Sequence, residues 1–350
     1  MTRTAALALV LLLAGCGGGG PRPAAGPAGD GADPPSLLAL ADSALAAGEP
    51  VRARALYERA LTASSRAGDA VHRARATVGM GRYYAAARRY RDARVEFERA
   101  AALDTTRAAP FYFLARAYLD AGEESQAIRA LVLGLRREPG EARSLEALRP
   151  LTRSRCEAVG VPPEFAELSS RTGVTRGELG VMLAVMLGLD PGREVWSSDR
   201  PPPAIPPEAD AAWGARWLRA AVMQGLLTSF PDGTLRLDDP VSRGLFALLV
   251  ARAERSLTAP TGPAGSGGPG DGGGAEELHV TLPDLGPRHY LRRAAQRAVQ
   301  LGLPTHSGGT FDPQAAASGE DVLRVLDRLA AGAGRTPVLP AELREALVVQ

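Results

Sequence analysis

The 350-residue sequence predicts an all-α protein built from two helical modules. A triplet of alanine, aromatic residue and alanine, with the spacing A-x3-aromatic-x2-A, recurs between residues 53 and 134. Two later stretches share helical apolar periodicity over equal lengths. The chain also has 40 glycines and 28 prolines but only 5% aromatic residues, which favours small modules joined by flexible segments over one large core.

The composition excludes several classes of function. With 41 basic and 39 acidic residues the net charge is only +2, so no bulk field attracts the chain to nucleic acid. All basic residues are arginine, which excludes a Walker A loop, a Schiff-base lysine and the protein-kinase lysine. The four histidines have no metal-ligand spacing, and a G-x-S-x-G elbow is absent. We therefore expect no catalysis, no metal and no cofactor.

The N-terminus has the pattern of a targeting signal. Arg3 is followed by an apolar run at 5–14, which has about half the 20 residues needed to span a bilayer. Leu13-Ala14-Gly15-Cys16 follows and resembles the lipobox of bacterial lipoproteins. The resemblance implies that residues 1–15 are a cleaved signal peptide and that Cys16 carries a diacylglycerol. The alternative is an ordinary secretory signal with a chance cysteine.

The segment after Cys16 is expected to be a tether. Residues 16–35 are mostly glycine, proline and alanine, a composition typical of flexible linkers. Gly17 stands at the position where an aspartate would favour retention at the inner membrane. The absence of that aspartate favours the outer membrane. Cys156 is the second of two cysteines, so a lipidated Cys16 leaves no intrachain disulfide. We predict that Cys156 is a buried small hydrophobe.

The recurring triplet marks three similar units. Its members are Ala53, Tyr57 and Ala60, then Ala93, Phe97 and Ala100, then Ala127, Leu131 and Gly134, where leucine and glycine replace the aromatic residue and the last alanine. The second interval is 34 residues and the first is 40, which indicates an insertion of six near 64–69. A matching first helix precedes each triplet, and Gly48 and Gly122 fall at the turns between paired helices. These triplet positions are predicted to be core.

This pattern resembles three tetratricopeptide repeats over 36–151, with a capping helix near 141–151. Each helix pair can bury its apolar face only by stacking on a neighbour. The resemblance implies a concave groove that holds a peptide or another protein, with Arg82 and Arg116 as groove contacts. The alternative for so short an array is a spacer or a dimer surface.

A second kind of repeat lies further along the chain. Residues 213–225 and 290–302 have equal lengths and helical apolar periodicity, and each leads into a glycine-containing turn. A serine then caps a second helix in each copy, Ser242 and Ser318. An earlier, truncated copy contributes only that second helix, which begins with a capping box at 175–178.

The copy at 213–250 resembles the S-layer homology domain. It has Trp213 at the start of its first helix, the turn Phe230-Pro231-Asp232-Gly233-Thr234, and the helix start Val241-Ser242-Arg243. The third copy has Gly319 where the motif arginine belongs, and the second has Leu245 in place of the motif glutamate. The resemblance implies three copies in a pseudo-threefold helical bundle with short loops.

In that family, anionic cell-wall polymers bind in grooves between copies. The resemblance implies glycan contacts from Arg176, Arg243, Trp213, Asp232 and Gly233. Arginine suits this role because its planar fork binds acidic oxygens in pairs, and the adjacent helix start adds N–H donors. The residues also allow a purely structural interpretation, in which the caps, the turn and the tryptophan serve the fold.

The order of these segments predicts a lipoprotein of the cell envelope, anchored in the outer membrane and facing the periplasm. The expected domains are a signal peptide (1–15), a tether (16–35), the repeats (36–151), the bundle (160–330) with a disordered insert (256–276), and a tail (331–350). The expected partners are cell-wall polysaccharide or peptidoglycan and a protein or peptide. The alternatives are an assembly scaffold whose bundle has lost glycan binding, and an accessory subunit of an envelope enzyme or secretion complex.

Overall fold

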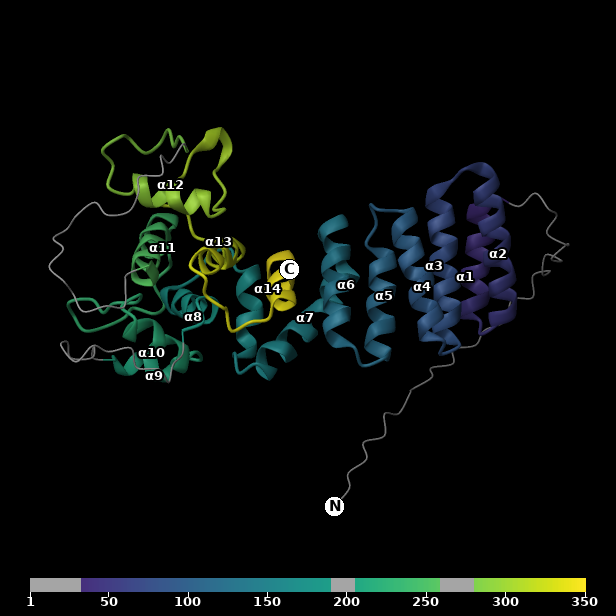
Figure 1. Ribbon diagram of the computed structural model, residues 1–350, viewed down its shortest axis with the longest axis horizontal. Coiled ribbons are helices and arrows are strands. Elements are labelled where there is room, and N and C mark those ends of the chain that lie inside the picture. Colours follow the sequence, from purple (N-terminus) through teal and green to yellow (C-terminus); the bar gives the residue numbers. More distant parts are fainter. Residues whose placement is uncertain (1–32, 190–204, 259–279) are drawn as a thin grey trace, which may run out of the picture.

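The computed structural model describes residues 33–189, 205–258 and 280–350, which form helices joined by turns (Figure 1). In these three ranges β pairing is limited to two isolated bridges, and the all-α prediction is confirmed. No helix in them is long and apolar enough to cross a bilayer. The predicted signal peptide, Cys16, and most of the tether and of the glycine-rich insert lie outside the described residues.

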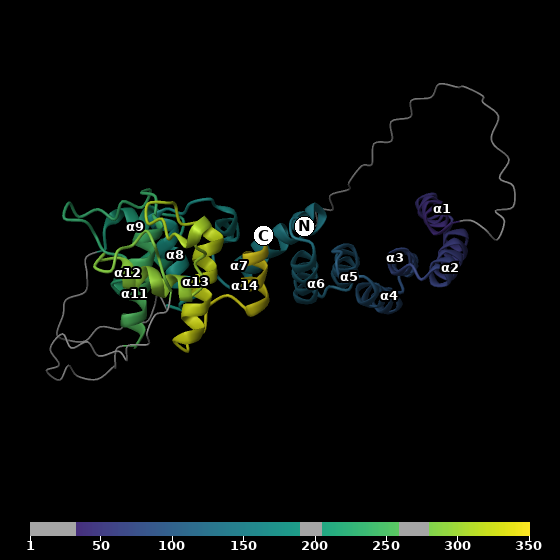
Figure 2. The same cartoon turned by 90° about the horizontal axis from the view of Figure 1, so that it is seen from above.

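The N-terminal part is a row of seven helices. In chain order they are α1 (Pro34–Ala46), α2 (Pro50–Ala67), α3 (Ala70–Ala86), α4 (Tyr90–Leu103), α5 (Ala109–Asp120), α6 (Glu124–Arg137) and α7 (Ala142–Ala158). Figure 2 shows α1, α3 and α5 on the inner side of a shallow arc, with α2, α4 and α6 outside. The row is a solenoid of helix pairs.

The predicted triplets form the interior of this solenoid. Tyr57 and Phe97 are each about 1% exposed, and the alanines of their triplets are fully buried. Two glycines of α3 make room for these rings. A Cβ atom on Gly79 would lie 2.1 Å from the Tyr57 ring, and one on Gly81 would lie 2.4 Å from the Phe97 ring. The Tyr57 ring therefore packs against the first helix of the following pair, and the Phe97 ring packs against the first helix of its own pair.

The insertion lengthens helices rather than adding a loop. Helix α2 has 18 residues and α3 has 17, whereas α4 and α6 have 14 each. Gly48 and Gly122 end their turns at φ of +74° and +76°, as their placement predicts. The equivalent residue of the second repeat is Arg88, at φ +57°, a left-handed conformation that costs a residue with a Cβ about 1 kcal/mol.

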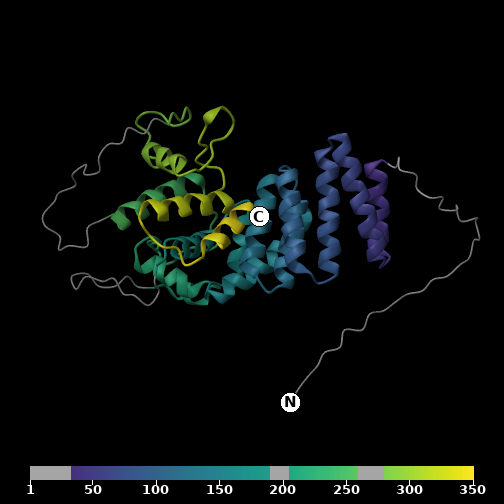
Figure 3. The ribbon, with the colours of Figure 1, turned by 45° about the vertical axis from the view of Figure 1, so that its right-hand side comes forward.

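The C-terminal segment is not a tail, contrary to the sequence-based expectation for 331–350. It forms helix α14 (Ala341–Val349), which lies between the two modules beside α6 and α7 (Figures 1 and 3). Ala346 is fully buried in the core of the solenoid, and Leu343 and Leu347 belong to the core of the C-terminal module. The i, i+3, i+4 spacing of these residues gives α14 the apolar stripe that docks it.

The C-terminal module packs helices around its own core. They are the 3-10 helix η1 (Pro163–Ser170), α8 (Arg176–Met186), α9 (Pro207–Ala211), α10 (Ala215–Met223), α11 (Arg243–Thr258), α12 (Arg292–Gln300), the 3-10 helix η2 (Ser307–Gly309) and α13 (Gly319–Gly332). Three of them, α8, α11 and α13, begin at the predicted caps. Thr175, Ser242 and Ser318 each accept a backbone N–H three residues on, and Thr175 and Glu178 complete a capping box.

A ring of three backbone hydrogen bonds joins these helix starts. Val241 N–H donates to the Val174 carbonyl, Ala317 N–H donates to the Val241 carbonyl, and Val174 N–H donates to the Ala317 carbonyl, all at 2.9 Å. Each residue lies just before the cap of its helix. The three starts are therefore related by an approximate threefold arrangement.

Candidate functional site

The inner face of the solenoid carries a cavity of about 370 Å³. Its walls come from α1, α3, α5 and α7 and from the turn between α4 and α5. The lining residues are Leu38, Asp42, Val71, Ala74, Arg75, Val78, Gly79, Arg82, Asp104, Arg107, Ala109, Pro110, Phe113 and Arg143. We refer to this cavity as the groove. It has the size of a site for a few side chains.

The repeat core orients the wall of the groove near α1. The Tyr57 hydroxyl donates to Asp42 Oδ1 at 2.7 Å, and Arg82 donates from Nη1 to the same oxygen at 2.5 Å. Burial, and then the hydrogen bond to Asp42, raises the pKa of Tyr57 well above its ordinary value, so the hydroxyl remains a donor. Asp42 thus neutralises Arg82 and fixes its side chain.

The ring of Phe113 forms part of the opposite wall, and Tyr112 lies next to it in the chain. The Arg82 guanidinium lies 5.5 Å from the centre of the Phe113 ring, and the Arg143 guanidinium lies 5.1 Å from the Tyr112 ring. At these distances the cations are attracted to the ring faces. Arg143 also donates from Nε to Glu141 at 2.8 Å, so both arginines are held in place.

Two further arginines of the groove form no ion pair with a described residue. Arg75 of α3 and Arg107, just before α5, are exposed, and neither makes an ion pair with a residue that the structure describes. The groove lining contains four arginines and two aspartates. Its unneutralised charge is therefore positive.

Of the two predicted groove contacts, the structure places one in the groove. Arg82 lines it, whereas Arg116 does not. Arg116 is exposed on α5, with Nη1 3.4 Å from the Tyr112 hydroxyl. Sequence reasoning missed Arg75, although it precedes Arg82 by two helical turns and so shares its face. No comparable sequence pattern marks Arg107 and Arg143, because their position at the groove depends on how the helix pairs stack.

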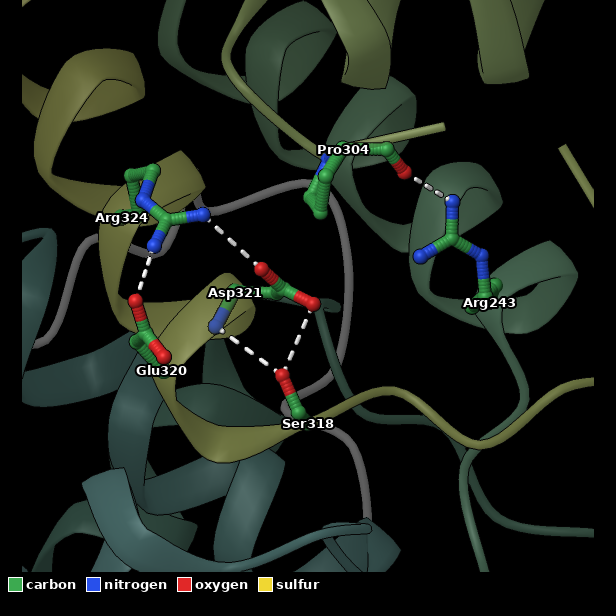
Figure 4. A network of polar contacts seen from close by, with 6 residues as sticks. All are labelled: Arg243, Pro304, Ser318, Glu320, Asp321 and Arg324. Carbon is green, nitrogen blue, oxygen red and sulfur yellow. Dashed lines mark hydrogen bonds and ion pairs between the residues drawn. The ribbon is translucent and has the colours of Figure 1, made fainter. Parts of the chain in front are cut away.

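The predicted glycan-binding arginines serve as internal contacts in the C-terminal module. Arg176 and Arg243 are only 7% and 2% exposed. Arg176 donates from Nε to the Leu235 carbonyl at 3.0 Å and from Nη2 to the Thr228 carbonyl at 3.2 Å. Arg243 does the same with the carbonyls of Phe311 and Pro304. Each arginine thus fastens its helix start to the turn of the following copy, and Figure 4 shows the Arg243–Pro304 contact.

These arginines are also covered by rings. The guanidinium of Arg176 lies 4.8 Å from the centre of the Phe230 ring, and that of Arg243 lies 5.1 Å from the Phe311 ring. Burial lowers the pKa of both, and nearby carboxylates oppose the effect. Buried guanidinium groups need such acceptors, so the fold alone accounts for both residues.

The third helix start differs for a steric reason. Gly319 holds the position of the missing arginine, and a Cβ atom there would lie 1.6 Å from the Leu168 carbonyl oxygen of η1. The backbone N–H of Gly319 donates to the Arg171 carbonyl at 2.9 Å. At this start Ser318 caps α13, and Arg324 pairs with Glu320 and Asp321 (Figure 4).

The remaining predicted glycan contacts belong to a surface turn. Asp232 accepts from the backbone N–H and the hydroxyl of Thr234 at 3.0 and 2.7 Å. These bonds, and the one from Arg236, lower the pKa of Asp232 well below its ordinary value. Gly233 provides a φ of +82°, and Trp213 is 41% exposed. The structure gives these residues turn and surface positions.

The five predicted glycan contacts line neither the groove nor a second cavity of the described residues. A second cavity, of about 570 Å³, lies between α7 and the end of η1, and its lining includes Arg149, Arg153 and Arg171. Neither this cavity nor the groove is lined by Arg176, Arg243, Trp213, Asp232 or Gly233. Arg176 and Arg243 join neighbouring copies, and the glycan role of the five residues stays a prediction.

No other chemical site stands out in the three described ranges. They contain no group of three or more histidine, cysteine, aspartate or glutamate residues arranged to hold a metal. Cys156 is fully buried, and this burial raises the pKa of its thiol to about 12. The prediction that it is a buried small hydrophobe is confirmed.

Comparison with known families supports the repeat assignment. The tetratricopeptide repeat family matches residues 84–149, which run from the end of α3 into α7 and include the Phe97 and Leu131 triplets. Together with the solenoid, this match shows that the chain carries tetratricopeptide repeats. No protein of curated function matches the chain.

Proposed function

We propose that the protein is a non-enzymatic adaptor that holds a segment of another protein in the groove. The observation that carries this proposal is the cavity on the inner face of the repeats, where apolar side chains and exposed arginines lie together. Tetratricopeptide repeats suggest protein–protein interaction, and a cavity of this size suits a segment rather than a whole domain.

Site-specific photo-crosslinking in cells tests this proposal. Val71 lines the groove and is 48% exposed, whereas Val95 of α4, outside the groove, is 60% exposed. A photoreactive amino acid replaces each valine in turn in the full chain. We expect discrete protein adducts from position 71 that are absent from position 95. Equal adduct patterns, or none from position 71, would contradict a binding role for the groove.

We propose that the C-terminal module, which resembles S-layer homology domains, acts as a scaffold that supports the repeats. The ring of hydrogen bonds between its helix starts supports a pseudo-threefold bundle like that of the family. The bonding of Arg176 and Arg243 to turn carbonyls favours a structural role over glycan binding. Docking of α14 on α6 and α7 further favours a module that supports the repeats.

Binding of cell-wall polysaccharide or peptidoglycan is the rival proposal for this module. Sedimentation of the full chain with purified cell-wall sacculi separates the two. We expect no more protein in the pellet than for an unrelated soluble protein. Specific sedimentation that Trp213→Ala abolishes would favour the glycan role instead, because Trp213 is the exposed aromatic of the predicted site.

We propose from the sequence that Cys16 carries a lipid anchor and that the protein faces the periplasm from the outer membrane. The lipobox-like segment at 13–16 supports this. Labelling with an alkyne fatty acid should modify the wild-type chain but not Cys16→Ser, and fractionation should place the labelled protein with outer membranes. Label on the Cys16→Ser chain would contradict lipidation at this cysteine.

A further inference from the structure

We infer that the groove recognises an acidic protein segment that also carries apolar side chains. This inference rests on the proposed function and specifies the chemistry of the partner. It follows from which charges of the groove are already neutralised within the chain, and from the apolar side chains of its lining.

The charges of the groove fall into two sets. Arg82 is neutralised by Asp42, and Arg143 by Glu141. Arg75 and Arg107 are exposed at the same cavity and form no ion pair with a described residue. Asp104 of the same lining attracts Arg107 only through space. An occupant that supplies carboxylates to these two arginines would satisfy them with charge-assisted hydrogen bonds.

Apolar side chains also line the groove. Val78 and Phe113, both half-buried, contribute to the lining, and Val71 is 48% exposed. An occupant with only acidic side chains would leave this apolar surface uncovered. Burial of an apolar side chain against it adds affinity that charge alone does not supply. The matching segment therefore combines acidic and apolar residues.

These features favour a protein segment over nucleic acid. Two aspartates, Asp42 and Asp104, line the groove among its arginines, so its positive charge is not a continuous stripe. Nucleic-acid sites typically extend positive charge along a stripe and add stacking platforms. The net charge of the chain is only +2. A single-stranded oligonucleotide serves as a competing probe.

Fluorescence anisotropy with the purified full chain tests the inference. The probes are labelled peptides of about 12 residues. The first alternates aspartate or glutamate with leucine or phenylalanine, the second has the amides in place of the acids, and the third has arginine there. A labelled oligonucleotide of similar length is the fourth probe. We expect the acidic peptide to bind at least about tenfold more tightly than the others, and added salt to weaken it.

Two variants locate the site. Arg75→Glu combined with Arg107→Glu should weaken binding of the acidic peptide by at least about tenfold, because both free cations are reversed. The matched control is Arg91→Glu, an exposed arginine of the outer helix α4 that does not line the groove. It should change binding by less than about twofold. Both proteins are checked for an unchanged helical circular dichroism spectrum.

The outcomes separate this inference from the proposed function. Equal binding of the acidic and amide peptides, tighter binding of the arginine peptide or the oligonucleotide, or no binding of any probe would each overturn the acidic specificity. Groove-specific crosslinks from position 71 would then leave the protein-binding role standing. If those crosslinks are also absent, both conclusions fall.

Discussion

Arg243 donates from Nε to the backbone carbonyl oxygen of Phe311 at 2.7 Å, although 68 residues separate the two in sequence. The Arg176–Leu235 bond is its equivalent one copy earlier. In both cases a helix start of one copy holds the turn of the next. The two arginines that the sequence predicts as ligand contacts thus form part of the packing between copies.

Replacing Arg243 by alanine should therefore destabilise the C-terminal module. The change leaves the Phe311 and Pro304 carbonyls without their donor, which costs about 1–3 kcal/mol for a buried group. We expect a loss of about 3 kcal/mol in the free energy of unfolding, measured by urea titration. Arg252→Ala, an exposed position on the same helix, should change stability by less than about 0.5 kcal/mol. Equal effects would contradict the internal role of Arg243.

Gly319 should tolerate no side chain. Alanine there would place its Cβ 1.6 Å from the Leu168 carbonyl oxygen, so either α13 or η1 must move. We expect Gly319→Ala to cost about 3 kcal/mol or more in urea unfolding, at the upper end of overpacking effects.

The control is Gly332→Ala at the other end of the same helix, where a Cβ meets nothing within 4 Å. That change should be neutral or stabilise by up to about 1 kcal/mol, since alanine is the better helix former. A chain that accepts alanine equally well at both ends of α13 would show that the contact with Leu168 is not tight.

The features that the sequence predicts are local ones. The caps at Thr175, Ser242 and Ser318 depend on residues three positions apart, and the Tyr57 and Phe97 triplets depend on spacing within one helix. Such patterns can be recognised in the sequence without knowing which elements pack nearby. For the same reason the turn glycines Gly48 and Gly122 are correctly placed.

The features that the sequence missed depend on contacts between distant segments. Docking of Ala346 in the solenoid core requires α14 to meet α6, more than 200 residues earlier in the chain. Position 319 lacks the motif arginine because a side chain there would collide with the backbone of Leu168. The groove likewise gathers Arg75, Arg107 and Arg143 from separate helix pairs, so its charge depends on how the pairs stack.

The second repeat offers a test of turn geometry. Arg88 adopts φ +57° at the position that glycine holds in the other two repeats. Because glycine reaches this conformation without a Cβ clash, Arg88→Gly should stabilise the repeats by about 0.5–1 kcal/mol in thermal unfolding. The reciprocal change, Gly122→Arg, should destabilise them by a similar amount. Destabilisation by Arg88→Gly would indicate that the arginine side chain itself supports the fold.

The buried thiol of Cys156 links stability to alkaline pH. Burial raises its pKa to about 12, above the value of about 8.5 for a free thiol. The folded state therefore favours the protonated thiol, and its contribution to stability is present at neutral pH and is lost as the pH rises from about 9 toward 12.

Thiol labelling provides the measurement, with Cys16→Ser so that Cys156 is the single cysteine. Near pH 8 we expect little reaction with an aromatic disulfide reagent in the folded state and complete reaction in urea, because the thiolate is the reactive form. Replacement by alanine removes this reactivity and serves as the blank. Rapid labelling of the folded protein would contradict the burial of this side chain.

Removing the negative charge of Asp42 should strengthen the binding of the acidic peptide. Its carboxylate neutralises Arg82 in the wall of the groove and accepts the Tyr57 hydroxyl. Asp42→Asn keeps an oxygen acceptor for Tyr57 but removes the negative charge, which leaves Arg82 as a third unneutralised cation beside Arg75 and Arg107. If the occupant of the groove is acidic, the affinity for the acidic peptide should rise by about two- to fivefold, measured by anisotropy at low salt, and the gain should shrink as salt is added.

The control is Glu58→Gln, which changes an exposed acidic residue of the outer helix α2 that pairs with Arg54. It also makes the net charge of the protein more positive by one and should leave the affinity unchanged. An equal gain from both variants would assign the effect to overall charge, and weaker binding by Asp42→Asn would mean that Arg82 must be held by its carboxylate to contact the partner.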